Sequence, residues 1–132
     1  MQDILSVLPH RQPFLMIDGV VELEPGKWAK GYKNITENEW FITDNQNYMP
    51  QMLVIEALAQ LSAFTSTNKE RGLGFLSSLK EVEFFKYARP GDRVDLYYEV
   101  IRNRKGFIFG KGQASVNGDI IAKANISIYI EK

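Results

Sequence analysis

The sequence contains no cysteine and a single histidine, His10. Without cysteine the chain has no disulfide, no thiolate nucleophile and no zinc–thiolate site. One histidine also excludes a metal site built from several imidazole ligands. We therefore expect no metal and no protein-bound cofactor.

The chain also lacks an excess of charge of either sign. Lys and Arg together number 16, and so do Asp and Glu, so the formal net charge is zero. This balance provides no basic surface for nucleic acid or anionic lipid. We expect a partner other than nucleic acid.

No hydrophobic run is long enough to cross a bilayer, which takes about 20 residues. The longest, near residues 52–64, is interrupted by polar residues, and the N-terminus does not have the pattern of a secretory signal. We expect a cytoplasmic protein without a membrane span. A length of 132 residues predicts one domain over residues 1–132.

Hydrophobic periodicity and turn residues predict the order of elements. We expect a short opening helix that ends at Pro9, a loop over 36–48, and a long helix from Pro50 to about Arg71. Strands are predicted over residues 14–24, 27–35, 74–88, 93–103, 106–117 and 119–131. One apolar helix with long antiparallel strands predicts an α+β domain in which the sheet wraps around the helix.

The end of the chain gives the clearest strand signals. Asn117-Gly118 between two alternating segments predicts a tight hairpin. In the last segment, the even-numbered residues from Ile120 to Ile130 are all apolar. Because side chains alternate between the faces of a strand, we expect these residues to share the buried face.

The helix predicted from Pro50 carries one carboxylate, Glu56, among apolar side chains. Turning 100° per residue from Met52 places apolar side chains nearly all round, which is typical of a buried helix. Gln60 follows four residues later and shares the face of Glu56. A strand partner or exposure at the helix edge would accommodate the charge, and so would a functional position beside a cavity. The pattern alone leaves these alternatives open.

Three motifs resemble those of the 3-hydroxyacyl-[acyl-carrier-protein] dehydratases. Residues 8–18, LPHRQPFLMID, are similar to the family's opening Leu-Pro-His-Arg-x-Pro-Phe-Leu-x-x-Asp motif. Residues 49–60, MPQMLVIEALAQ, are similar to its helix start, and residues 89–100, RPGDRVDLYYEV, to its Pro-Gly-Asp strand entry. The resemblance covers essentially the whole chain and implies the hotdog fold, a long central helix wrapped by an antiparallel sheet.

The resemblance also implies a substrate and a site. The substrate would be a 3-hydroxyacyl thioester, carried on the phosphopantetheine of an acyl carrier protein or on CoA. Glu56 would help to expel the 3-hydroxyl as water, while N–H groups at the helix start hold the thioester carbonyl. The implied substrate-binding residues are Pro50, Gln51, Met52, Gln60, Phe75 and Leu76. The family implies a homodimer, or a trimer of dimers, with acyl tunnels at the subunit interface.

Two departures from the family pattern fall at this site. The family histidine lies in a His-Phe-Pro-Gly stretch before the helix, whereas this chain reads FITDNQNYMP and has no histidine there. The candidates in its place are Asp44 as a base and Asn45 as a hydrogen-bond donor to a carbonyl. Gln51 replaces the glycine of the helix start. We interpret His10, in the opening motif, as structural.

Three interpretations follow from the resemblance and its departures. The first is a dehydratase-like lyase of fatty-acid or related acyl-chain synthesis, in which Glu56 acts beside a substitute base or an ordered water. The second is a hotdog thioesterase in which Glu56 alone is the base or the nucleophile. The third is an acyl-thioester binder or structural subunit paired with an active homologue. We favour an enzyme of the first kind.

Overall fold

The computed structural model of this protein describes residues 8, 14–66 and 73–131, except for the side chains of residues 73–75 and 131. Two expectations lie outside the described residues. One is the short opening helix with His10, and the other is the last part of the predicted long helix, residues 67–71.

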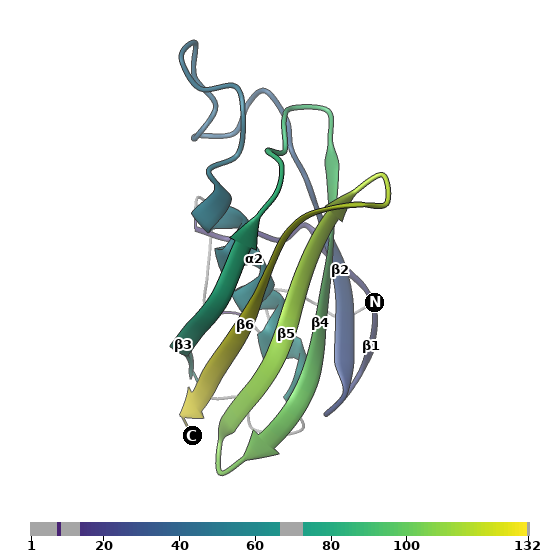
Figure 1. The fold of residues 1–132 in the computed structure, drawn as a ribbon, viewed down its shortest axis with the longest axis vertical. Coiled ribbons are helices and arrows are strands. Elements are labelled where there is room, and N and C mark those ends of the chain that lie inside the picture. Colours follow the sequence, from purple (N-terminus) through teal and green to yellow (C-terminus); the bar gives the residue numbers. More distant parts are fainter. Residues whose placement is uncertain (1–7, 9–13, 67–72, 132) are drawn as a thin grey trace.

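Six antiparallel strands form one sheet in the order β1-β2-β4-β5-β6-β3 (Figure 1). The strands are β1 (Gly19–Glu24), β2 (Trp28–Asn34), β3 (Leu73–Phe84), β4 (Arg93–Arg104), β5 (Phe107–Val116) and β6 (Asp119–Glu131). The hairpin predicted between β5 and β6 is present. Its turn residues Asn117 and Gly118 have φ angles of 51° and 87°, as a two-residue hairpin turn requires.

Helix α2 (Gln51–Ser62) lies along one face of the sheet, and Figure 1 shows it behind the strands. It packs against β2, β4, β5 and β6, and a short 3₁₀ helix, η1 (Ala63–Thr65), follows it. Its buried side chains include Val54, Leu58 and Leu61. The predicted α+β architecture, with a sheet wrapped around an apolar helix, is confirmed. No helix in the described part of the chain is long and apolar enough to span a membrane.

Two glycines allow α2 to approach the strands closely. A Cβ atom on Gly31 would lie 3.0 Å from Leu61 Cδ1 and 2.6 Å from the carbonyl oxygen of Gly19. A Cβ on Gly112 would lie 3.2 Å from Leu58 Cδ1. Side chains at these two positions would push the helix away from the sheet that positions it.

The first strand is shorter than predicted. Strand β1 begins at Gly19, and the preceding residues 14–17 do not pair with a neighbouring strand. The backbone N–H of Met16 instead donates a hydrogen bond to Oε1 of Gln60, at 2.8 Å. The prediction of a strand from residue 14 is therefore wrong, because this segment bonds to a helix side chain rather than to the sheet.

The long helix changes its geometry earlier than predicted. The α-helix ends at Ser62, and only one 3₁₀ turn continues it before Ser66 adopts an extended backbone. The hydroxyl of Thr65 donates to the carbonyl oxygen of Ser62 at 2.7 Å. Such short-range hydroxyl bonds offer the backbone an alternative to regular helix, which accounts for the early end.

The last strand departs from strict alternation at its beginning. Ile120 is 38% exposed, whereas its neighbour Ile121 is 2% exposed. The register with β5 shifts here, since Ala122 pairs with Ala114 but Ile120 pairs with Ser115. The extra residue forms a bulge that turns Ile121 inward, so the prediction for Ile120 is wrong. From Ala122 to Ile130 the even-numbered residues are buried, as predicted.

Candidate functional site

Glu56 and Gln60 come together on one face of α2, as their spacing predicts. Glu56 is half-buried, and Gln60 is only 2% exposed. The amide Nε2 of Gln60 donates a hydrogen bond to Oε1 of Glu56 at 3.1 Å. The carboxylate is therefore oriented by a buried amide one helical turn away.

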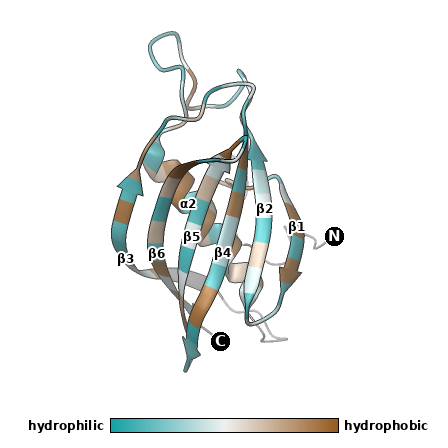
Figure 2. Ribbon diagram, turned by 45° about the vertical axis from the view of Figure 1, so that its right-hand side comes forward, coloured by the Kyte–Doolittle hydropathy of each residue, from teal (hydrophilic) through white to brown (hydrophobic). Residues whose placement is uncertain are grey.

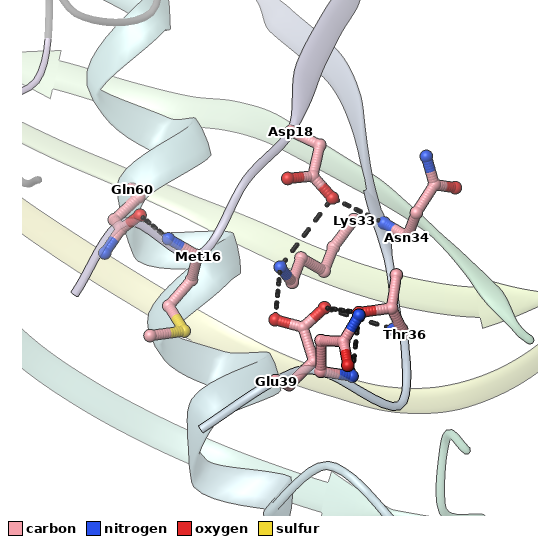
Figure 3. Close-up of polar contacts among 8 residues, drawn as sticks. Met16, Asp18, Lys33, Asn34, Thr36, Glu39 and Gln60 are labelled. Atoms are coloured by element: carbon pink, nitrogen blue, oxygen red, sulfur yellow. Dashed lines mark hydrogen bonds and ion pairs between the residues drawn. The ribbon is translucent and has the colours of Figure 1, made fainter. Parts of the chain in front are cut away.

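The amide of Gln60 is itself fixed by the segment that runs before β1. Its Oε1 accepts the hydrogen bond from the N–H of Met16 (Figure 3), and its Nε2 donates to the carbonyl oxygen of Phe14 at 2.8 Å. A buried amide with both ends engaged is held in one orientation, because any other would leave polar groups unsatisfied. The position of Glu56 thus depends on backbone groups far away in the sequence.

The start of α2 presents free N–H groups rather than a side-chain cap. Pro50 is the N-cap residue, and it makes no side-chain capping bond; no acidic residue lies in the first turn. The N–H of the buried Met49 donates to the carbonyl oxygen of Ala88 at 2.8 Å, which ties the helix start to the segment after β3. Gln51 is half-buried and Met52 is exposed. The N–H groups of a first turn, at the positive end of the helix dipole, suit an oxygen with partial negative charge.

Asp44 and Asn45 lie at the tip of a turn within the loop that precedes α2. Backbone hydrogen bonds join Thr43 and Gln46 in both directions, at 2.9 and 3.2 Å, so Asp44 and Asn45 occupy the two central positions. Both are exposed, neither forms a hydrogen bond with Glu56, and Figure 1 shows the loop projecting beyond the sheet. Residues of these two types are frequent turn formers.

Phe75 and Leu76 lie on β3, a strand at the edge of the sheet. The backbone of Phe75 pairs with Tyr129, but its side chain lies outside the described residues. Leu76 is 51% exposed. Among the described side chains of β3, from Leu76 to Phe84, none is buried.

A charged cluster that the sequence analysis did not identify holds the loop in place. Lys33 is 5% exposed, and its Nζ lies 3.1 Å from Oε1 of Glu39 and 3.7 Å from Oδ2 of Asp18 (Figure 3). Glu39 also accepts from the N–H of Thr36, and Asp18 from the N–H of Asn34. The cluster joins the segment before β1, strand β2 and the loop before α2. Asp18 is the last residue of the opening motif that resembles the dehydratases, and this resemblance was the available sequence signal.

Comparisons with known proteins agree with this geometry. The FabA-like domain matches residues 8–125 of the chain. The 3-hydroxyacyl-[acyl-carrier-protein] dehydratase FabZ of Bacillus subtilis is 39% identical over 132 residues, which cover 96% of this chain and 94% of FabZ. The uncharacterized protein YcsD of the same organism is 60% identical over 125 residues, or 95% of this chain and 96% of YcsD.

One solved structure shows the same fold at low sequence identity. The dehydratase heterocomplex ApeI:P from Xenorhabdus doucetiae superposes with a TM-score of 0.88 at 16% identity, covering all 100% of this chain and 93% of that chain. Taken with the motifs, the sheet order and the FabZ identity, these matches confirm the resemblance. The chain belongs to the FabA-like family of hotdog-fold proteins, to which the 3-hydroxyacyl-[acyl-carrier-protein] dehydratases also belong.

Proposed function

We propose that this protein is a dehydratase-like lyase acting on 3-hydroxyacyl thioesters, carried by an acyl carrier protein or by CoA. The observation that carries the proposal is a half-buried Glu56 held by the buried Gln60, in a chain 39% identical to FabZ. The substrate would bring its own phosphopantetheine arm, so the proposed reaction uses no metal and no protein-bound cofactor.

In the proposed reaction Glu56 is the proton donor. The thioester carbonyl accepts hydrogen bonds from the N–H groups of Gln51 and Met52, which stabilise the charge that develops when the α-proton is removed. Glu56 gives its proton to the 3-hydroxyl as the carbon–oxygen bond breaks, so that water leaves. No histidine stands in the loop before α2, so an ordered water relays the α-proton to the Glu56 carboxylate as that carboxyl gives its own proton to the hydroxyl, and Glu56 ends the reaction protonated again.

Gln60 has a positioning role in this proposal. Both ends of its amide are occupied by Phe14, Met16 and Glu56, so it has little capacity left to contact a substrate. By donating to Oε1 it directs the carboxylate of Glu56.

The missing histidine also supports a second candidate, a thioester hydrolase. Hydrolysis needs one carboxylate that activates a water against the thioester carbonyl, with helix N–H groups as the oxyanion site. Glu56 and the first turn of α2 would supply both. The two reactions differ in their products, since hydrolysis releases a free thiol and dehydration releases an enoyl thioester.

A dimer joined through β3 belongs to the proposal. Strand β3 is 12 residues long, and within the described residues one of its edges pairs with no other strand, which makes it a ready template for pairing with another chain. Its described side chains include Leu76, Leu79 and Val82, and none of them is buried within one subunit. A second copy of the chain, paired along β3, would bury this apolar surface.

The decisive experiment follows both products at once. Purified protein is given a 3-hydroxyacyl thioester on carrier protein and on CoA, and enoyl thioester and free thiol are measured in parallel. Because a general acid typically contributes 10²- to 10⁴-fold, we expect Glu56→Gln to lower enoyl formation by roughly a hundredfold or more. The exposed Glu22 lies on β1, at the opposite edge of the sheet from β3, and Glu22→Gln is the matched control that should retain activity.

The other outcomes separate the alternatives. Free thiol that depends on Glu56 would identify a hydrolase and exclude the lyase. Absence of both products with retained acyl-carrier binding would point to a non-catalytic subunit. ApeI:P, which has the same fold, is a dehydratase heterocomplex, so such a subunit would be tested with an active homologue added.

A further inference from the structure

A hollow with an excess of positive charge lies on the face of the sheet opposite α2, the face nearer the viewer in Figure 2. We name it the outer hollow. It has a volume of about 300 Å³ and crosses β3, β4, β5 and β6. Its walls include Lys80, Arg102 and Lys111, together with Ser78, Phe109 and Ser127. None of these residues belongs to the site proposed for Glu56.

The register of the strands brings the three cations together. Lys80 and Lys111 both pair with Asn125, from the two strands on either side of it, and Arg102 pairs with Phe109 on β5. All three cations are exposed, and in the part of the chain that the structure describes none forms an ion pair. Their charges are therefore available to a ligand.

Three carboxylates, Glu81, Glu83 and Glu99, line an adjoining hollow that shares Lys111 and Asn125 with the outer hollow. Glu99 pairs with Lys111 across β4 and β5, and it makes no ion pair with that lysine. Glu81 accepts a hydrogen bond from Nδ2 of Asn125 at 2.9 Å. None of the three carboxylates lines the outer hollow itself, whose walls carry three positive charges and no negative one.

Arg102 is held in a defined orientation. Its guanidinium carbon lies 4.8 Å above the centroid of the Phe109 ring, a cation–π arrangement. A stacked guanidinium keeps its N–H groups free for the oxygens of an anion, and its second face can stack on another flat ring. The hydroxyls of Ser78 and Ser127 add hydrogen-bonding groups beside it.

We propose that the outer hollow binds an organic phosphate with a flat heteroaromatic ring, that is, a nucleotide. The three cations would form ion pairs with the phosphate, and the ring would stack on the guanidinium of Arg102, which itself stacks on Phe109. A volume of about 300 Å³ falls at the lower end of the range for small-molecule sites, which favours a small ligand over a protein surface. The site lies on the opposite face of the sheet from α2 and does not depend on the function proposed for Glu56.

The test is isothermal titration calorimetry of the full chain with ADP, adenosine and inorganic phosphate at low ionic strength. We expect ADP to bind, and adenosine and phosphate each to bind at least roughly tenfold more weakly, because each supplies one of the two features. Arg102→Gln should weaken ADP binding by roughly tenfold or more. Lys30→Gln, an exposed cation on β2 outside the outer hollow, is the matched control and should leave binding unchanged.

Three results would overturn the proposal. The first is no heat of binding with ADP at millimolar concentration. The second is equal affinity of the Arg102→Gln and Lys30→Gln proteins for ADP. The third is phosphate binding as tightly as ADP, which would remove the ring from the recognition. Both substitutions are at exposed positions, and thermal unfolding of each variant checks that the fold is retained.

Discussion

At the scale of single residues, Tyr97 and Tyr98 show how neighbours on one strand meet opposite environments. Tyr98 points toward α2, is fully buried, and donates from its hydroxyl to the carbonyl oxygen of Ile126 at 2.6 Å. Tyr97 lies on the other face and is half-buried. Burial raises the pKa of the Tyr98 phenol, because the charged phenolate is poorly solvated in the core.

We expect Tyr98→Phe to lower the free energy of unfolding by about 1–2 kcal/mol at neutral pH, since a buried carbonyl loses its donor. Tyr97→Phe is the control, with a change within about 0.5 kcal/mol. The folded state raises the pKa of Tyr98 above its unfolded value of about 10, so the folded protein holds this proton more tightly. The difference in unfolding free energy between the wild type and Tyr98→Phe should therefore become smaller as pH rises above about 10. Urea unfolding at several pH values measures the loss of unfolding free energy and its pH dependence. A difference between the wild type and Tyr98→Phe that stays constant above about pH 10 would contradict the predicted pH dependence.

At the scale of elements, the loop before α2 is fixed at both ends. Its beginning is held by Lys33 through Asp18 and Glu39, and its end by the hydrogen bond from Met49 to Ala88. Since the helix that carries Glu56 starts directly after the loop, the charged cluster helps to determine where that helix begins. The tip between these anchors is exposed.

We expect Lys33→Met to lower the free energy of unfolding by roughly 3 kcal/mol, because two partly buried carboxylates lose their partner. Amide hydrogen exchange should quicken in residues 36–48, since the loop loses its first anchor. Lys27→Met is the matched control. Lys27 pairs with Glu24 at 3.3 Å on the surface, and losing that pair should cost less than about 1 kcal/mol. Equal losses in the two variants would show that the buried cluster does not hold the loop.

At the scale of the whole molecule, the two edges of the sheet differ. Strand β1 is 6 residues long, and its inward-facing Val20 is buried. Strand β3 is twice as long, with 12 residues, and none of its described side chains is buried. A long edge strand with exposed backbone N–H and C=O groups favours pairing with a strand of another chain, whereas a short edge strand offers few such groups.

If two copies pair along β3 as proposed, Leu76→Asp should convert the dimer to a monomer at micromolar concentration. A buried, unpaired carboxylate at the interface is costly, while at a position already 51% exposed it costs the isolated subunit little. Val21→Asp, at an exposed position on the opposite edge, is the control and should remain dimeric. Sedimentation equilibrium distinguishes the two states. A monomeric wild type, or a dimeric Leu76→Asp protein, would rule out pairing through β3.

Local sequence patterns were sufficient for the architecture. The spacing of apolar residues placed α2 and the four long strands, and Asn117-Gly118 placed the hairpin between the last two. The i to i+4 spacing of Glu56 and Gln60 put them on one face of the helix, where they are hydrogen-bonded. These features depend on residues close in sequence, whose relative positions are fixed by the repeat of a helix or strand.

The features that local patterns did not predict depend on contacts between segments far apart in the sequence. The orientation of the Gln60 amide is fixed by Phe14 and Met16, more than 40 residues away in sequence. Because this segment bonds to Gln60, β1 begins at Gly19 and not at residue 14 as predicted. The bulge that buries Ile121 arises from pairing with β5. The sequence by itself determined the sheet-wrapped helix and its carboxylate. Only the tertiary structure decided how that carboxylate is held, because a buried polar group takes its partner from whatever segment the fold brings beside it.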